Sequence, residues 1–89
     1  MPKKISRIRG LKPGDLVTHV LYGRTWVGVL IEIKEEESGL ATPREVALVQ
    51  MQLGSEYEHF FKTNVSKKYR INDTMGYVST NWLFKLKKK

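Results

Sequence analysis

The sequence contains no cysteine, and its two histidines stand far apart in the chain. Without cysteine, the chain has neither disulfides nor thiolate zinc sites. His19 and His59 also lack the closely spaced partners that metal ligands usually have. We therefore predict that no metal or other cofactor supports this domain. Association with further copies of the chain is the remaining way to bury more surface.

Long apolar runs are missing as well. No stretch approaches the roughly 20 apolar residues that are needed to cross a bilayer. Residues 1–10 are basic, but they lack the apolar run of a secretory signal. We predict that the protein has no membrane partner. The absence of cysteine is compatible with the cytoplasm, or with the host cytoplasm if the chain is viral.

Motifs for catalysis are absent too. The chain has no G-x-S-x-G sequence, no glycine pattern of a phosphate-binding loop and no motif that places a pair of carboxylates. Three adjacent acids, Glu35, Glu36 and Glu37, are typical of a solvated loop rather than of a metal site. No catalytic residue is predicted, and we expect a binding protein rather than an enzyme.

Positive charge is what the sequence has in excess. Sixteen Lys and Arg residues stand against nine Asp and Glu residues, which gives a net charge of +7. Such a balance favours polyanionic partners, of which nucleic acid is the most common, although plain solubility explains it equally well. The basic residues gather at 3–12, 62–70 and 85–89.

The length of 89 residues is enough for one domain and too little for two. We expect a single domain over 1–89, with a basic N-terminal arm at 1–12 and a basic tail at 87–89. Ile5, Ile8 and Leu11 share a helical stripe, so one short N-terminal helical turn is predicted before Pro13.

Alternating apolar residues and turn signals predict an all-β fold. Strands are expected at 16–22, 26–33, 45–53 and 77–86, and a further short strand is possible at 69–71. Residues 57–62 alternate as a strand would, whereas Ser55-x-x-Glu58 has the form of a helix-capping box; we favour the strand. Val27, Val29, Ile31 and Ile33 are predicted to face the core, and Gly28 indicates a sharp bend or a close backbone approach. About five strands predict a small antiparallel barrel.

The first predicted hairpin, 20–30, resembles the first motif of the Sm-like (Lsm) family. Val20, Gly23, Gly28 and Leu30 stand at that family's spacing. The resemblance implies a homo-oligomeric ring that binds RNA. Residues 78–84 keep the apolar frame of the family's second motif but lack its Arg-Gly pair, and 34–38 lack its base-binding residues. We therefore expect contacts to the nucleic-acid backbone, with little sequence preference.

A second resemblance is to SH3 domains. Residues 76–83 look like their closing segment, and 13–17 fit the turn that opens one of their strands. The N-terminal aromatic motif and the paired tryptophans of peptide-binding SH3 domains are missing. This resemblance implies a module for protein interaction or for assembly of a larger particle, including one of viral or phage origin.

Candidate site residues follow from basic residues mixed with aromatic ones, which suit phosphate contact and base stacking. For nucleic acid they are Arg24, Lys62, Lys67, Lys68, Tyr69, Arg70 and Asn81. For contact between subunits we expect side chains that are both apolar and exposed, namely Trp26, Tyr57, Phe61 and Leu83. Trp82 is instead predicted to lie in the core.

Overall fold

The computed structural model describes residues 10–36, 44–63 and 67–86. The predicted helical turn around Ile5 and Ile8, most of the basic arm, Glu37 and the tail 87–89 lie outside the described residues. Of the described residues, no helix is long and apolar enough to span a membrane.

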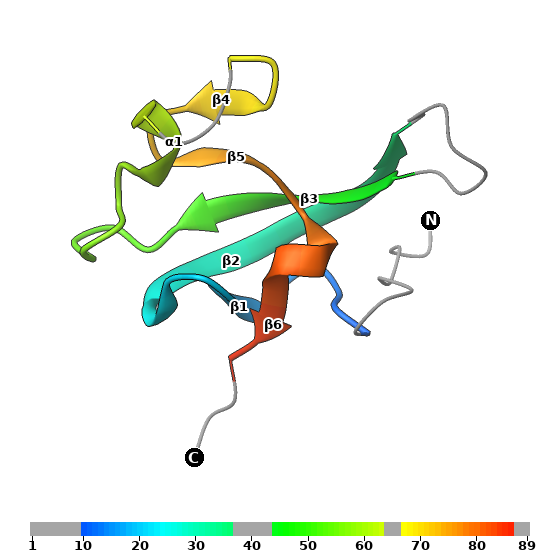
Figure 1. The fold of residues 1–89 in the computed structure, drawn as a ribbon, viewed down its shortest axis with the longest axis horizontal. Coiled ribbons are helices and arrows are strands. Elements are labelled where there is room, and N and C mark those ends of the chain that lie inside the picture. The colour runs from blue at the N-terminus through cyan, green and yellow to red at the C-terminus, as the bar shows by residue number, and fades with distance from the viewer. Residues whose placement is uncertain (1–9, 37–43, 64–66, 87–89) are drawn as a thin grey trace.

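The described residues form one antiparallel sheet of six strands, with the strand order β4-β5-β3-β2-β1-β6 (Figure 1). The all-β prediction is confirmed, but the sheet has six strands rather than five, and its edge strands β4 and β6 do not pair with each other. The elements are β1 (Leu16–His19), β2 (Gly23–Glu36), β3 (Arg44–Met51), α1 (Phe60–Thr63), β4 (Arg70–Asn72), β5 (Met75–Ser79), the 3-10 turn η1 (Thr80–Trp82) and β6 (Leu83–Lys85).

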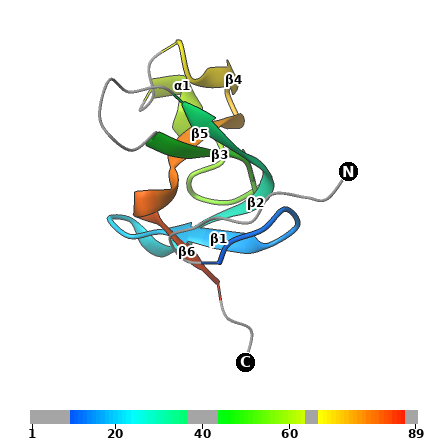
Figure 2. The same cartoon turned by 90° about the vertical axis from the view of Figure 1, so that its right-hand side faces the viewer.

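The long strand β2 gives the sheet its curvature. Its first half pairs with β1, for example Val29 with Leu16, and its second half pairs with β3 as far as Glu36 with Arg44. Figure 2 shows β2 arching between these two partners. The last strand, β6, returns beside β1, so that His19 lies opposite Leu83. The sheet therefore curls around one core without closing through hydrogen bonds.

A β-bulge in β2 overturns the predicted core face of that strand. Leu30 pairs with Val49 and Glu32 with Leu48, so Ile31 is left unpaired. Trp26 and Leu30 are fully buried on the core face before the bulge, whereas Ile31 is 44% exposed. Of the four residues predicted to face the core, only Ile33 is buried. The bulged residue Ile31 shifts the alternation by one position, which places Ile33 on the same face as Trp26 and Leu30.

Gly28 is needed for space rather than for an unusual backbone conformation. A Cβ atom there would overlap Cγ1 of Val49 and lie 3.2 Å from the carbonyl oxygen of Gln50. The close approach predicted at Gly28 is therefore confirmed. It allows β2 to lie tightly against β3 where the sheet bends.

Residues 57–62 do not form the predicted strand. The chain makes turns after β3 and then the short helix α1, so the helical alternative was the better interpretation of this segment. Phe60 and Phe61 are both buried, with their rings perpendicular at a centroid distance of 5.2 Å. A turn of helix lets both adjacent rings face the same core, whereas neighbours along a strand point to opposite faces.

The predicted final strand 77–86 is broken in the middle. The Ser79 side chain accepts a hydrogen bond from the backbone N–H of Asn81, and the buried Thr80 hydroxyl contacts the Glu45 carboxylate at 2.9 Å. These bonds hold η1 and turn the chain between β5 and β6. As a result Leu83 is buried, whereas Trp82 is 44% exposed, which corrects the prediction that Trp82 lies in the core.

The bulge generates a direct stability test. We expect Leu30→Ala to cost about 2–4 kcal/mol, because it empties a fully buried position. Ile31→Ala should cost less than about 1 kcal/mol, because that side chain is already partly solvated and lies outside the core. Urea unfolding of both variants measures the difference. Equal losses, or a larger loss for Ile31, would contradict the bulged register.

Candidate nucleic-acid interface

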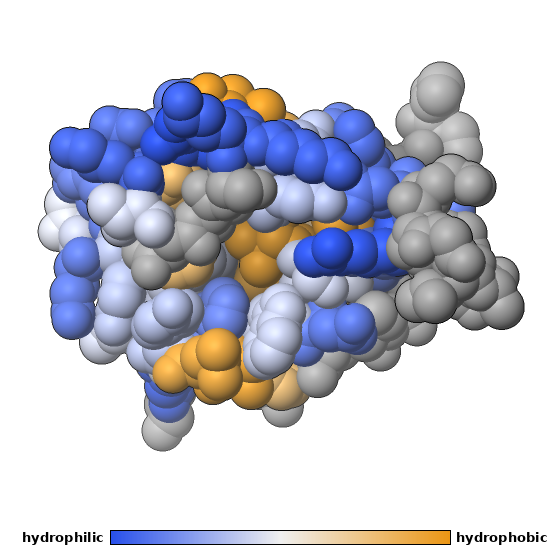
Figure 3. Space-filling model, turned by 45° about the horizontal axis from the view of Figure 1, so that its top comes forward, coloured by the Kyte–Doolittle hydropathy of each residue, from blue (hydrophilic) through white to orange (hydrophobic). Residues whose placement is uncertain are grey.

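Four basic side chains predicted to bind phosphate lie together at the β4 edge of the sheet. This group, the basic surface, consists of Lys62 at the end of α1, Lys67 and Lys68 in the following turn, and Arg70 in β4. Nη1 of Arg70 donates to the Lys62 carbonyl oxygen at 3.0 Å, which joins the helix to the strand. The three lysines are exposed. Figure 3 shows a band of hydrophilic residues over this end of the molecule.

Tyr69 lies within this surface, but its ring is already engaged. Lys68 Nζ lies 5.4 Å from the ring centroid, and the guanidinium carbon of Arg44 lies 5.6 Å from it. The Tyr69 hydroxyl donates to Oε1 of Glu36 at 2.9 Å. Tyr69 therefore orders the cations around it, and the basic surface suits phosphate contact better than base stacking.

The basic surface is a local concentration of cations in a body that has no net charge. Residues 10–86 contain nine basic and nine acidic residues, so the whole net charge of +7 belongs to 1–9 and 87–89. Residues 10–86 can therefore attract phosphate only at the places where their basic side chains cluster. Lys62, Lys67, Lys68 and Arg70 provide the densest group.

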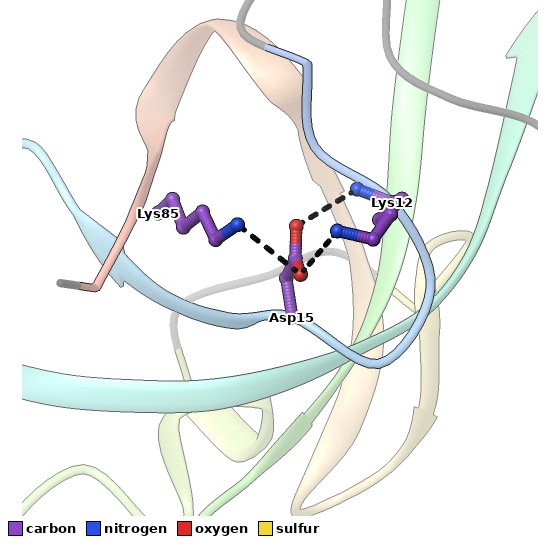
Figure 4. A network of polar contacts seen from close by, with 3 residues as sticks. All are labelled: Lys12, Asp15 and Lys85. Atoms are coloured by element: carbon purple, nitrogen blue, oxygen red, sulfur yellow. Dashed lines mark hydrogen bonds and ion pairs between the residues drawn. The ribbon is translucent and has the colours of Figure 1, made fainter. Parts of the chain in front are cut away.

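Two lysines near the ends of the described chain, Lys12 and Lys85, meet at one junction, built around Asp15 (Figure 4). The Asp15 carboxylate accepts from the Lys12 backbone N–H at 3.1 Å and lies 3.5 Å from Lys12 Nζ and 3.8 Å from Lys85 Nζ. The Leu86 N–H also donates to the Leu16 carbonyl oxygen at 2.8 Å. The chain therefore enters and leaves the fold side by side.

A second surface is aromatic and lies around the β1–β2 turn. This aromatic platform consists of the partly exposed rings of Tyr22, Tyr57 and Trp82, which rest on the buried His19 and Phe60. His19 stacks on Trp82 at 5.9 Å with an interplanar angle of 7°, and its centroid lies 4.8 Å from that of Tyr22. Tyr22 in turn contacts Tyr57 at 5.3 Å.

Arg24 and Asn81 belong with the aromatic platform and not with the basic surface. Arg24 is exposed at the start of β2, two residues after Tyr22, and the exposed Asn81 precedes Trp82 in η1. η1 leads into β6, at the opposite edge of the sheet from β4. The predicted nucleic-acid residues thus form two groups, which the sequence did not separate.

Three of the four predicted subunit contacts lie in the monomer core. Trp26, Phe61 and Leu83 are fully buried, so their predicted exposure is wrong. Trp26 faces inward because it precedes the bulge of β2, Phe61 because α1 turns it under the sheet, and Leu83 because η1 resets the strand. Tyr57 alone is partly exposed, as a member of the platform.

The platform was not predicted because its rings come from three separate segments, 19–22, 57–60 and 82. The one local signal was the polar run Ser79, Thr80 and Asn81, which interrupts the alternation before Trp82 and indicates a turn there.

No protein-family model matches the chain, and no curated protein or solved structure matches it either. Within 10–36, 44–63 and 67–86, no group of three or more His, Cys, Asp or Glu residues is placed to hold a metal ion.

His19 is the buried centre of the platform. Its Nδ1 accepts a hydrogen bond from the Leu21 N–H at 3.1 Å, so that nitrogen is unprotonated in the folded protein. Burial lowers the pKa of His19 from its ordinary value of 6.5. The Trp26 ring packs edge-on against it at 5.3 Å, and the buried Trp26 Nε1 has no hydrogen-bond partner among the described residues. The cluster is therefore built for a neutral imidazole.

This burial predicts a pH-dependent stability. Because the pKa of His19 is lower in the folded state, the unfolded chain takes up the proton more readily. The contribution of neutral His19 is complete above pH 6.5 and is lost as the pH falls below it. Urea unfolding between about pH 7.5 and 5.5 should show this loss. His19→Phe should remove it, and the control His59→Gln should retain it; a fall unchanged in His19→Phe would contradict this origin.

Proposed function

We propose that this protein is a non-enzymatic nucleic-acid-binding module that contacts the phosphate backbone through the basic surface. The observation that carries the proposal is the convergence of Lys62, Lys67, Lys68 and Arg70 on one edge of a body that has no net charge over residues 10–86. Clustered cations release condensed counterions when they bind phosphates, which gives affinity without sequence recognition. The cytoplasm remains the predicted compartment.

The residues at the positions of the Sm family's base-binding loop support a backbone mode. Lys34 lies over the Tyr77 ring at 5.0 Å, and Glu36 accepts the Tyr69 hydroxyl. These side chains are engaged within the fold, and Glu36 brings negative charge to the place where a base would bind. We therefore propose low sequence preference.

For this function we propose a small barrel of the Sm-like or SH3-like kind that assembles into a ring. The last strand, β6, pairs with the first strand, β1. A sheet that curls toward a closed barrel brings its first and last strands together in this way. The outer edges of β4 and β6 pair with no strand in the described part of the chain, and Ile71 in β4 is 54% exposed. Unpaired edges recruit further strands, and repetition about an axis closes a ring.

The alternative is an SH3-like module for protein interaction or particle assembly. The segment that resembles the SH3 closing strand contains the η1 turn and the exposed Trp82, and this favours a surface for a protein partner. Binding to nucleic acid at low salt discriminates between the two functions.

The basic surface is tested by affinity at two salt concentrations. We expect the protein to bind RNA more tightly at about 50 mM than at 200 mM salt, with a steep slope. Lys67→Gln/Lys68→Gln should weaken binding and reduce the slope of log affinity against log salt by about 1 per lost contact. The control Lys12→Gln/Lys34→Gln removes the same charge elsewhere and should change binding less. Failure to bind RNA at low salt would favour the interaction module.

The ring is tested by the mass in solution. Light scattering at micromolar concentration should give a cyclic assembly of about five to seven chains, a range taken from the Sm-like resemblance. Ile71→Pro should block pairing at the β4 edge and reduce the mass. A mass of 10.3 kDa for the unaltered protein would contradict the ring without bearing on the basic surface.

A further inference from the structure

The basic surface leaves the aromatic platform without a role. Trp82 is 44% exposed and Tyr22 is 37% exposed, although large aromatic side chains usually lie in the core. Leu21, 68% exposed, adds apolar surface to the same turn. Aromatic rings held at the surface in one cluster mark a binding site more often than isolated apolar residues do.

We propose that the aromatic platform stacks unpaired nucleobases, so that the protein prefers single-stranded over duplex nucleic acid. This inference rests on the proposed function and adds the class of nucleic acid. In a duplex, the base faces are covered by neighbouring bases, whereas a single strand can place them on aromatic side chains.

The geometry of the rings suits a flat ligand. Centroid distances along the chain of rings from Trp82 through His19 and Tyr22 to Tyr57 run from 4.8 to 5.9 Å. Rings this close pack against each other and leave no slot between them for an inserted side chain. What they offer a ligand is their exposed outer surface, which a base can cover by stacking.

The platform is also held in place before any ligand binds. The Trp82 carbonyl oxygen accepts the Val20 N–H at 2.8 Å, which fixes η1 against the β1–β2 turn. One face of the Trp82 indole is covered by His19, with nearly parallel planes. The exposed part of Trp82 is therefore oriented by its neighbours, which lowers the entropy cost of binding.

Polar groups beside the platform match a nucleotide. Arg24 offers a cation near Tyr22, and Asn81 offers an amide beside Trp82 that can bond to a base edge. Tyr57 and Lys62 stand five residues apart in one segment, so their Cα atoms are at most about 18 Å apart. One strand can therefore run from the platform to the basic surface. A purely apolar peptide would use neither Arg24 nor the basic surface.

Tryptophan fluorescence provides a direct readout, because the two tryptophans differ in exposure. Trp26 is fully buried and Trp82 is partly exposed. Titration with an oligothymidylate of about 12 nucleotides should quench Trp82 by stacking. In Trp82→Phe, the remaining Trp26 emission should stay nearly constant while the oligonucleotide still binds.

Affinity measurements complete the test. Trp82→Leu keeps an apolar side chain against His19 but removes the stacking ring, and it should weaken oligothymidylate binding at least about tenfold. Binding to a duplex of equal length should not change. Ile31→Ala, which alters an equally exposed apolar residue outside the platform, should leave both affinities unchanged. Circular dichroism confirms that each variant is folded.

The outcomes separate the two proposals. Equal oligothymidylate affinity in Trp82→Leu and the unaltered protein, or a parallel loss for the duplex, would overturn base stacking while leaving the basic surface intact. If the unaltered protein binds neither the oligothymidylate nor the duplex at low salt, both proposals fail. Quenching of Trp82 by a peptide alone would instead assign the platform to a protein partner.

Discussion

The pair of adjacent rings in α1 closes a sheet that hydrogen bonds leave open. On one side, Phe61 packs against β5, where a Cβ on Gly76 would come within 2.6 Å of its ring. On the other side, Phe60 lies 5.4 Å from both Trp26 and Tyr22, centroid to centroid. The two rings thus span from one half of the curled sheet to the other. Side-chain packing supplies the closure that an edge-to-edge ladder supplies in a complete barrel.

The same pair couples the core to the aromatic platform. The Phe60 ring contacts the Tyr22 ring and lies 6.1 Å from the His19 ring. Tyr22 in turn contacts Tyr57, and His19 stacks on Trp82. The platform is therefore the outer layer of the core rather than an addition to it. Each of its rings packs against a neighbouring ring or the buried core. A partner that binds there meets a surface whose shape is fixed by the fold.

Much of the fold could be predicted from sequence, and the errors have local causes. The strand regions, the turn at Pro13–Gly14 and the close approach at Gly28 follow from alternation and turn chemistry. The prediction of the core face of β2 was wrong because the bulge at Ile31 cannot be recognised from the alternation of apolar and polar residues. The basic surface could be predicted because its residues are neighbours in the chain. The platform could not, since topology alone brings its segments together.

The net positive charge and the folded binding surfaces belong to different parts of this chain. Because residues 10–86 carry equal numbers of basic and acidic residues, the net charge that would attract the proposed polyanion at long range belongs to 1–9 and 87–89. Attraction of this kind is screened by salt and carries no information about the partner. Discrimination must then come from contacts at short range, where the described fold offers a cluster of cations at one edge and a rigid set of rings at the other. In the binding that we propose, a body with no net charge is an advantage, since it lets the placement of a few side chains decide how a nucleic-acid strand is oriented.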